Sequence, residues 1–261
     1  MEIVFPAVMM LAGLGAVFGI GLAVASRAFA VATDPRVEQI EESLPGANCG
    51  ACGFAGCSAY AEAVAKGVAP TGACIPGGAS TAGAIAGIMG VEADIAEKRI
   101  AVVHCQGRNV ASRFQYAGVT DCRAAALLQG GFKSCAYGCL GLGSCVEACP
   151  FGGIQMVDGL PVVNPDMCVA CGKCVEACPR DLISLHPVKA AVQVMCRSTD
   201  KGGVVRKVCS TGCIGCKKCE KVCDAEAIHV ENFLARIDDQ KCTQCGKCLD
   251  ACPTHAIARV L

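Results

Sequence analysis

Cysteine constrains this chain more than any other residue type, because 24 of its 261 residues are cysteine and most recur at fixed spacings. Two runs follow one pattern, Cys-x2-Cys-x2-Cys-x3-Cys-Pro, and begin at Cys168 and Cys242. The repeat extends further, since nine cysteines recur 74 positions later without a gap. The nine are Cys122, Cys135, Cys139, Cys145, Cys149, Cys168, Cys171, Cys174 and Cys178, and they reappear as Cys196, Cys209, Cys213, Cys219, Cys223, Cys242, Cys245, Cys248 and Cys252. The chain therefore carries two tandem copies of one cysteine-rich unit.

The spacing within each run is that of bacterial ferredoxins, in which four thiolates hold a [4Fe–4S] cluster. Soft thiolates are the ligands that iron prefers in sulfide clusters. A disulfide framework is the alternative for so many cysteines, but it is typical of secreted chains, and the regular ferredoxin spacing argues against it. The two units therefore predict iron–sulfur electron transfer.

In a two-cluster ferredoxin the fourth cysteine of each run ligates the other cluster, which predicts two clusters per unit. In the first unit, one predicted ligand set is Cys149, Cys168, Cys171 and Cys174. The other predicted set is Cys135, Cys139, Cys145 and Cys178. In the second unit, one predicted set is Cys223, Cys242, Cys245 and Cys248. The other predicted set is Cys213, Cys216, Cys219 and Cys252.

One position breaks the repeat, because Leu142 stands where the second unit has Cys216. We expect Cys135 to supply the missing ligand, reaching in from a wider spacing. Its counterpart Cys209 is then spare, although either Cys209 or Cys213 could serve in the second unit.

A third arrangement lies upstream, where Cys49, Cys52, Cys57 and Cys74 are separated by two, four and 16 residues. The first three occupy a loop rich in glycine and alanine, and a short helix is expected over 58–66. Zinc also accepts four cysteines, so this set alone would leave the metal open. Beside two ferredoxin units, a fifth [4Fe–4S] cluster is the favoured interpretation.

Four cysteines have no place in these five sets: Cys105, Cys122, Cys196 and Cys209. Cys105 and Cys196 each end an apolar run that is typical of a strand. We favour buried structural thiols for all four. The alternative is a sixth cluster, since four thiols remain.

The N-terminal segment from Ile3 to Ser26 has 24 residues without a charge, enough to cross a hydrocarbon core that needs about 20. A cleaved signal peptide is the alternative, but the usual basic region is missing, because only Glu2 precedes the apolar run. Arg27 and Arg36 follow the segment, and the positive-inside tendency therefore places the rest of the chain in the cytoplasm. We predict a retained single-pass anchor in the cytoplasmic membrane, in contact with lipid.

The formal net charge is zero, but this value counts each cysteine as neutral. Five oxidised clusters with their thiolates would bring the loaded protein to about −10, which disfavours nucleic acid as a partner. Lysines near the ligands could form a docking patch for an acidic electron donor, or could simply offset the cluster charge. They are Lys173, Lys217, Lys218, Lys221, Lys241 and Lys247.

Motifs for nucleotides and catalysis are missing from the sequence. It has neither a phosphate-binding G-x-x-x-x-G-K-[ST] loop nor a dinucleotide-binding G-x-G-x-x-G after a strand. The four histidines are scattered, and no nucleophile–base pair is visible. We therefore expect no catalytic side chains and no cofactor site beyond the metal ligands.

The predicted fold class is α+β: one N-terminal transmembrane helix, a small [4Fe–4S] domain and two tandem bacterial-ferredoxin-like domains. β-hairpins are expected over 154–163 and 227–237, because turn residues interrupt apolar runs there. A short helix is expected after each fourth-ligand loop. The expected division is an anchor at 1–30, a linker at 31–45, the first cluster domain at 46–90, a connecting segment at 91–121, and ferredoxin-like domains at 122–190 and 191–261.

These features together resemble the B subunit family of Rnf complexes, in its long form with extra ferredoxin domains. The resemblance rests on the N-terminal helix, on NCGACGFAGCSAYA with its distant Cys74, and on CAYGCLGLGSCVEACPFGGI and CGKCVEACPRDLI. It implies a subunit of an ion-translocating ferredoxin:NAD⁺ oxidoreductase that accepts electrons from soluble ferredoxin and passes them to other membrane and peripheral subunits. NAD, flavins and the ion path would then belong to those subunits.

Two other classes stay open from the sequence. One is an iron–sulfur adaptor of a different redox complex, of the hydrogenase or reductase type. The other is a corrinoid-activating or methyl-transfer protein, because the Cys49–Cys74 module also resembles one found there. That second class should carry a corrinoid-binding domain, and none is visible.

Overall fold

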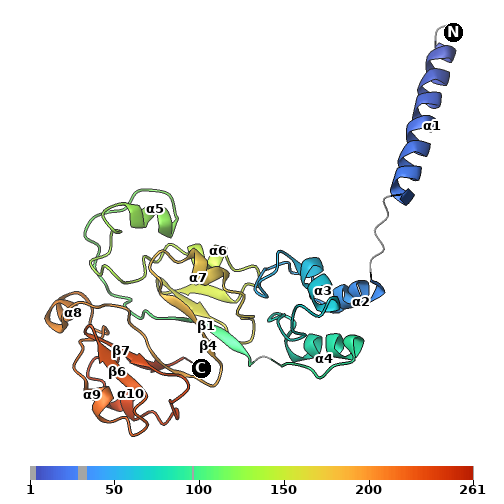
Figure 1. Ribbon diagram of the computed structural model, residues 1–261. Helices are drawn as coiled ribbons and strands as arrows, with labels where there is room; N and C mark the ends of the chain where they lie inside the picture. The colour runs from blue at the N-terminus through green and yellow to red at the C-terminus, as the bar shows by residue number, and fades with distance from the viewer. Residues whose placement is uncertain (1–3, 29–33, 96, 261) are drawn as a thin grey trace.

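The apolar N-terminal segment forms one long helix, α1 (Val4–Ala28), which stands apart from the rest of the chain (Figure 1). The computed structural model describes residues 4–28, 34–95 and 97–260. At 1.5 Å per residue, α1 is about 37 Å long, sufficient for a hydrocarbon core of about 30 Å. Its stretch Met9–Arg27 has a mean hydropathy of 2.0 and is unburied, so the helix is long and apolar enough to cross a membrane.

Three helices follow and pack together: α2 (Pro35–Ser43), α3 (Cys57–Ala65) and α4 (Gly78–Met89). Asp34 caps α2, because its carboxylate accepts a hydrogen bond from the backbone N–H of Arg36. Ile40 of α2 is fully buried against residues of α3 and α4. The segment 31–45 is therefore more than the expected linker, since most of its described part is a helix belonging to this core. The helix expected over 58–66 is present as α3.

Each ferredoxin unit contains a tight antiparallel hairpin, as predicted. In the first unit β2 (Ile154–Val157) pairs with β3 (Leu160–Val163), and in the second β6 (Ile228–Glu231) pairs with β7 (Leu234–Ile237). Both turns are two residues long and have positive φ at each position, 49° and 76° at Asp158-Gly159 and 48° and 62° at Asn232-Phe233. These angles match the turn type that best fits the strand twist.

A second two-stranded sheet completes each unit. In the first unit β1 (Arg99–Val103) pairs antiparallel with β4 (Ile183–Pro187), and in the second β5 (Val192–Val194) pairs with β8 (Ile257–Arg259). The strands expected before Cys105 and Cys196 are therefore confirmed as β1 and β5. Because β1 lies in the expected connecting segment 91–121, that segment is an integral part of the first unit.

Four short helices each contain the third cysteine of a run and end before the fourth: α6 (Ser144–Glu147), α7 (Lys173–Ala177), α9 (Lys218–Lys221) and α10 (Lys247–Ala251). The expectation of a helix after each fourth cysteine was wrong. Strands β2, β4, β6 and β8 follow there, because a proline or a turn ends the loop and an apolar run comes next. Two further helices, α5 (Cys122–Leu127) and α8 (Gly202–Val208), precede the cysteine runs.

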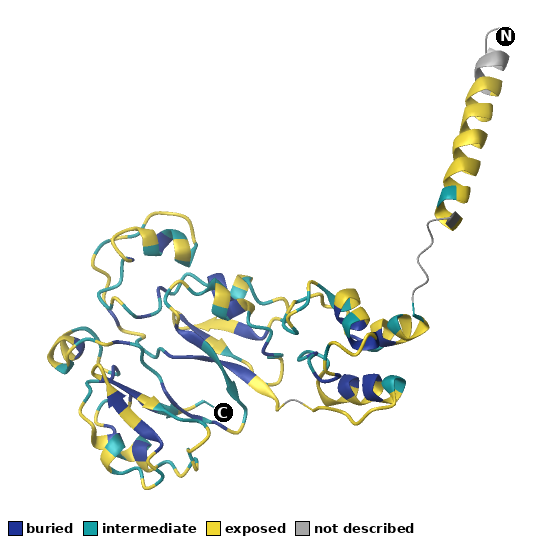
Figure 2. Cartoon of the chain, viewed as in Figure 1, coloured by how far each residue is buried: buried dark blue, intermediate teal, exposed yellow. Residues whose placement is uncertain are grey.

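Each unit has its own small core between its sheets and helices. Leu182 and Ile183 are buried in the first unit, and Val192 and Ile257 in the second. Cysteines belong to both cores: Cys145 and Cys174 in the first, and Cys213, Cys219, Cys248 and Cys252 in the second. Figure 2 shows that burial is concentrated along these strands and helices, whereas the stretch Met9–Arg27 of α1 has no buried residue.

Candidate iron–sulfur centres

The N-terminal domain brings together Cys49, Cys52, Cys57 and Cys74, which line one cavity and are named site 1. The loop is fixed by Asn48, whose side-chain oxygen accepts a hydrogen bond from the Cys57 backbone N–H at 2.8 Å. Burial raises the pKa of Cys74, and the other three thiols raise it further. The four cysteines predicted from their spacing therefore converge.

Site 2 is formed by Cys149, Cys168, Cys171 and Cys174, as the crossing pattern predicts. Burial raises the pKa of Cys174 to about 12, and the thiols of the other three contribute to the rise. The Cys168 sulfur also accepts a hydrogen bond at 3.4 Å from the backbone N–H of Ala101 in β1. The strand from the connecting segment thus supports this site directly.

The second unit forms two sites with the predicted membership. Site 4 is a cavity lined by Cys213, Cys216, Cys219 and Cys252. Site 5 comprises Cys223, Cys242, Cys245 and Cys248, where burial raises the pKa of Cys248 and the other three thiols add to the effect.

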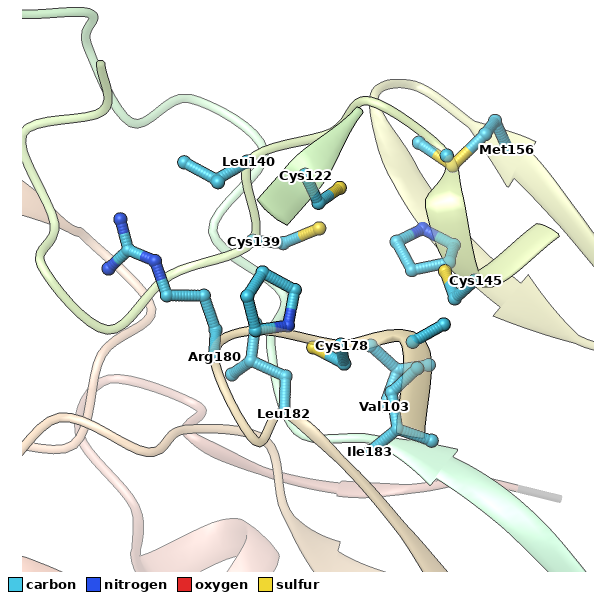
Figure 3. Close-up of a pocket in the computed structure, with 14 residues that line it drawn as sticks. Val103, Cys122, Cys139, Leu140, Cys145, Met156, Cys178, Arg180, Leu182 and Ile183 are labelled. Atoms are coloured by element: carbon cyan, nitrogen blue, oxygen red, sulfur yellow. The ribbon is translucent and has the colours of Figure 1, made fainter. Parts of the chain in front are cut away.

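The remaining site of the first unit differs from the sequence prediction. One cavity, site 3, is lined by Cys139, Cys145 and Cys178 together with Cys122, and Figure 3 shows these four side chains around a common space. Cys135, which was expected there, lies in another cavity. Burial raises the pKa of Cys145 to about 11, and the nearest thiols that contribute are Cys122 and Cys178.

A short polar network holds Cys122 at site 3. Its backbone N–H donates to the Ser144 hydroxyl oxygen at 2.8 Å, and that hydroxyl donates to the Asp121 carboxylate at 3.0 Å. Asp121 in turn caps α5 by accepting from the Ala124 N–H at 2.7 Å. The second unit has Lys218 in place of Ser144. A serine beside Cys145, together with Asp121-Cys122, was thus a sequence signal for this ligand set.

Cys135 lies instead in a cavity between the two units, which we name the junction cavity. Its lining includes all three of the other cysteines left over once Cys122 joins site 3, namely Cys105, Cys196 and Cys209. Burial raises the pKa of Cys196 to about 11, and among the contributing thiols is Cys135.

The sites suit thiolates bound to a cation. All 24 cysteines lie in the described part of the chain as free thiols. Backbone N–H groups point at sulfurs, for example Ala227 to Cys223 at 3.3 Å and Ala256 to Cys252 at 3.2 Å. Burial nevertheless raises the pKa of thiols in most sites, so bare thiolates would be unfavourable there without positive charge from iron.

Each of the five sites brings together four cysteines, the number of thiolates that holds one [4Fe–4S] cluster. The five sites therefore fit [4Fe–4S] clusters.

Three family models match segments that contain these sites. The model described as "Putative Fe-S cluster" matches residues 44–76, the 4Fe-4S binding domain matches 161–184, and the 4Fe-4S dicluster domain matches 212–257. Fold, sites and models together define an iron–sulfur protein with several ferredoxin-type cluster domains and a candidate membrane helix.

Full-length relatives identify the family. The B subunit of the ion-translocating oxidoreductase complex of Methanosarcina acetivorans is 47% identical over 98% of both chains. The B subunit of the Na⁺-translocating ferredoxin:NAD⁺ oxidoreductase complex of Acetobacterium woodii is 48% identical over 94% of this chain and 74% of its own. Its proton-translocating counterpart from Clostridium ljungdahlii is 45% identical over 95% and 89%. The chain therefore belongs to the B subunit family of ion-translocating oxidoreductase (Rnf) complexes, which confirms the resemblance seen in its motifs.

Proposed function

We propose that this chain is the electron-transfer subunit of a membrane-bound, ion-translocating ferredoxin:NAD⁺ oxidoreductase, and that it takes electrons from reduced ferredoxin. The observation that carries the proposal is a row of cysteine sites leading from an exposed C-terminal end to the domain that follows the membrane helix. Membership of the Rnf B subunit family supports the same role.

Each of sites 1 to 5 would hold one [4Fe–4S] cluster through its four cysteines. When bound, the clusters supply one-electron redox chemistry. The protein contributes the thiolates, the N–H donors to sulfur and the apolar walls. The proposed ligands are those predicted from spacing, with Cys122 taking the place of Cys135 at site 3.

A cysteine of one site lies close to a cysteine of the next site, and these neighbours give the order of the sites in the row. Cys49 of site 1 is among the thiols that raise the pKa of Cys171 in site 2. Cys145 of site 3 acts in the same way on Cys174 of site 2. Sites 4 and 5 share one core, in which Cys219 packs with Cys248. Edge-to-edge proximity of this kind is what one-electron transfer between centres requires.

The C-terminal end of the row is the proposed docking surface for ferredoxin. Among the cysteines, all of which are described, only Cys216 of site 4 and Cys245 of site 5 are exposed. Five exposed lysines surround these sites and would attract an acidic donor: Lys217, Lys218, Lys221, Lys241 and Lys247. Lys247 is paired with Asp224 and Lys217 with Glu220, so the patch is only partly neutralised.

The opposite end of the row lies next to the membrane. Site 1 belongs to the helical domain that directly follows α1, and α1 would span the cytoplasmic membrane once. Arg27 in the last turn of α1 and Arg36 beyond the helix favour a cytoplasmic location for all sites. Electrons would therefore leave from site 1 toward other subunits, which would also carry the NAD site, the flavins and the ion path.

Reduction by ferredoxin tests the proposal. The full chain is purified anaerobically in detergent and mixed with reduced ferredoxin, and visible absorbance is followed by stopped flow. We expect rapid bleaching that slows as salt is raised, because screening weakens docking at the lysines. Absence of bleaching, with dithionite still able to reduce the protein, would remove ferredoxin as the donor. Co-purification of other membrane subunits with the solubilised chain tests its place in the complex.

A further inference from the structure

We infer that the junction cavity holds a sixth [4Fe–4S] cluster, with Cys105, Cys135, Cys196 and Cys209 as its ligands. The inference adds a metal site to the proposed function and rests on that function only for the site's role as a relay. The four thiols come from four separate segments of the chain, two from each unit, and they line one cavity.

The cavity is built symmetrically from the two units. Cys105 lies two residues beyond the end of β1, and Cys196 lies two residues beyond the end of β5. Cys135 lies four residues before Cys139 of site 3, and Cys209 lies four residues before Cys213 of site 4. Each unit therefore contributes one cysteine from the end of an equivalent strand and one from an equivalent loop.

Hydrogen bonds to sulfur repeat the same symmetry. The Cys105 sulfur accepts from the backbone N–H of Cys139 at 3.5 Å, and the N–H of Gly107 also acts to lower its pKa. The Cys196 sulfur accepts from the backbone N–H of Ser198 at 3.5 Å, and the N–H of Cys213 also acts to lower its pKa. Pairs of backbone donors aimed at sulfur stabilise thiolates and tune clusters, and neutral buried thiols do not need them.

Glycines keep the space beside the sulfurs open. A Cβ atom at Gly107 would lie 3.2 Å from the Cys209 sulfur, and one at Gly138 would lie 3.3 Å from the Cys135 sulfur. Gly212, the counterpart of Gly138 in the second unit, has the Cys209 sulfur at 3.7 Å from such an atom. A side chain at any of the three would crowd the metal ligands.

A half-buried cation lines the same cavity. Arg197 follows Cys196 directly and lines the junction cavity, and one of its terminal nitrogens donates to the Ser184 hydroxyl at 3.1 Å. Its Nε is buried and has no hydrogen-bond partner among the described residues. A cluster with four thiolates carries a negative charge of about −2, which would favour a cation on the cavity wall, whereas four neutral thiols would not.

The position of this site explains what it would do. The backbone N–H of Cys139, a site 3 ligand, donates to the Cys105 sulfur, and Cys213, a site 4 ligand, is close enough to Cys196 to shift the pKa of its thiol. The junction cavity thus lies between the sites of the first unit and those of the second. A centre here would accept one electron from a neighbouring centre and give it to the next, with no bond made or broken and no proton moved.

Metal analysis of the full chain tests the inference. Iron, sulfide and zinc are measured per chain in the anaerobically purified protein, in Cys209→Ala and in Cys105→Ala. Val208→Ala is the matched control, because Val208 lines the same cavity next to Cys209 but carries no thiol. We expect about 24 iron atoms in the unchanged chain and in the control, and about 20 in each cysteine variant, since one cluster holds four.

Each other outcome overturns the inference and leaves the row of sites interrupted between the two units, while donation of electrons by ferredoxin is tested separately. About 20 iron atoms in the unchanged chain and in both cysteine variants would mean five clusters and structural thiols in the cavity. One zinc per chain that disappears in Cys209→Ala would make the cavity a zinc site. Spin integration of the dithionite-reduced protein gives a second measure that needs no variant, with about six spins expected and about five contradicting. Failure of the proposed function would show separately, as absence of bleaching by ferredoxin.

Discussion

The residue that decides the ligand pattern of the first unit is Leu142. It removes the ligand that Cys216 supplies in the second unit, and the repeat then places Cys122 opposite Cys196. From the sequence we expected Cys135 to supply the missing ligand, because it precedes Cys139 in the same run. The structure favours Cys122, because Cys122 lines the cavity of site 3 whereas Cys135 lines the junction cavity. Cys122 and its repeat counterpart Cys196 therefore belong to different sites, site 3 and the junction cavity.

A rescue experiment tests the assignment of Cys122. Cys122→Ala should lower the iron content by about four atoms, because site 3 loses a ligand. Adding Leu142→Cys to that variant should restore the iron, because it recreates the triplet of the second unit. Iron content after anaerobic purification is the measurement. Full iron in Cys122→Ala alone would contradict the assignment.

The Ser144 hydroxyl should matter for the stability of site 3. Ser144→Ala removes the acceptor for the Cys122 N–H and a donor to Asp121, which should cost about 1 to 3 kcal/mol because a buried donor is left without its partner. We expect faster loss of iron to a chelator, by several-fold. The exposed Ser210→Ala is the matched control and should release iron at the unchanged rate.

At the scale of elements, the parts set by local pattern were predictable. Both hairpins, the apolar N-terminal helix, α3 and the strands before Cys105 and Cys196 follow from apolar runs and turn residues. The helix α2 was missed because its sequence is mostly polar, with Val37 and Ile40 as its two apolar core residues and Asp34 as its capping residue. The pairing of β1 with β4 joins residues 80 to 88 positions apart, which no local pattern encodes.

Helix α2 should stabilise the domain that carries site 1. Ile40 is fully buried, so Ile40→Ala should destabilise this domain by about 2 to 5 kcal/mol. Hydrogen exchange followed by mass spectrometry should show faster exchange in α2, α3 and α4 and unchanged exchange in the two ferredoxin units. Val91→Ala, at a half-exposed position beyond α4, should leave all rates unchanged. Equal protection in Ile40→Ala would show that α2 does not belong to this core.

At the scale of the whole molecule, the cysteines form part of the cores that hold the units together. The units have few aromatic residues and no tryptophan, and thiols occupy positions that apolar side chains fill elsewhere. Bound metal should therefore supply much of the folding free energy. The order of the sites along the molecule could not be predicted, because it depends on contacts between units rather than on spacing within them.

Removal of the metal should unfold the cluster domains. Anaerobic chelation should abolish the near-ultraviolet circular dichroism and the hydrogen-exchange protection of β1 to β8, because buried thiols without iron leave these cores unfilled. The helix α1 should keep its helicity in detergent, since its hydrogen bonds are internal. A metal-free protein with native exchange protection would contradict this role of the clusters.

The central claim is that the sites form one continuous row from a ferredoxin-docking end to the membrane end. Stopped-flow bleaching by reduced ferredoxin, compared between the unchanged chain and Cys209→Ala, tests it most directly. We predict rapid bleaching of all clusters in the unchanged chain and in Val208→Ala. In Cys209→Ala only sites 4 and 5 should bleach rapidly, about two fifths of the remaining absorbance, because the row is broken at the junction. Bleaching in Cys209→Ala as fast and complete as in the unchanged chain would contradict the row.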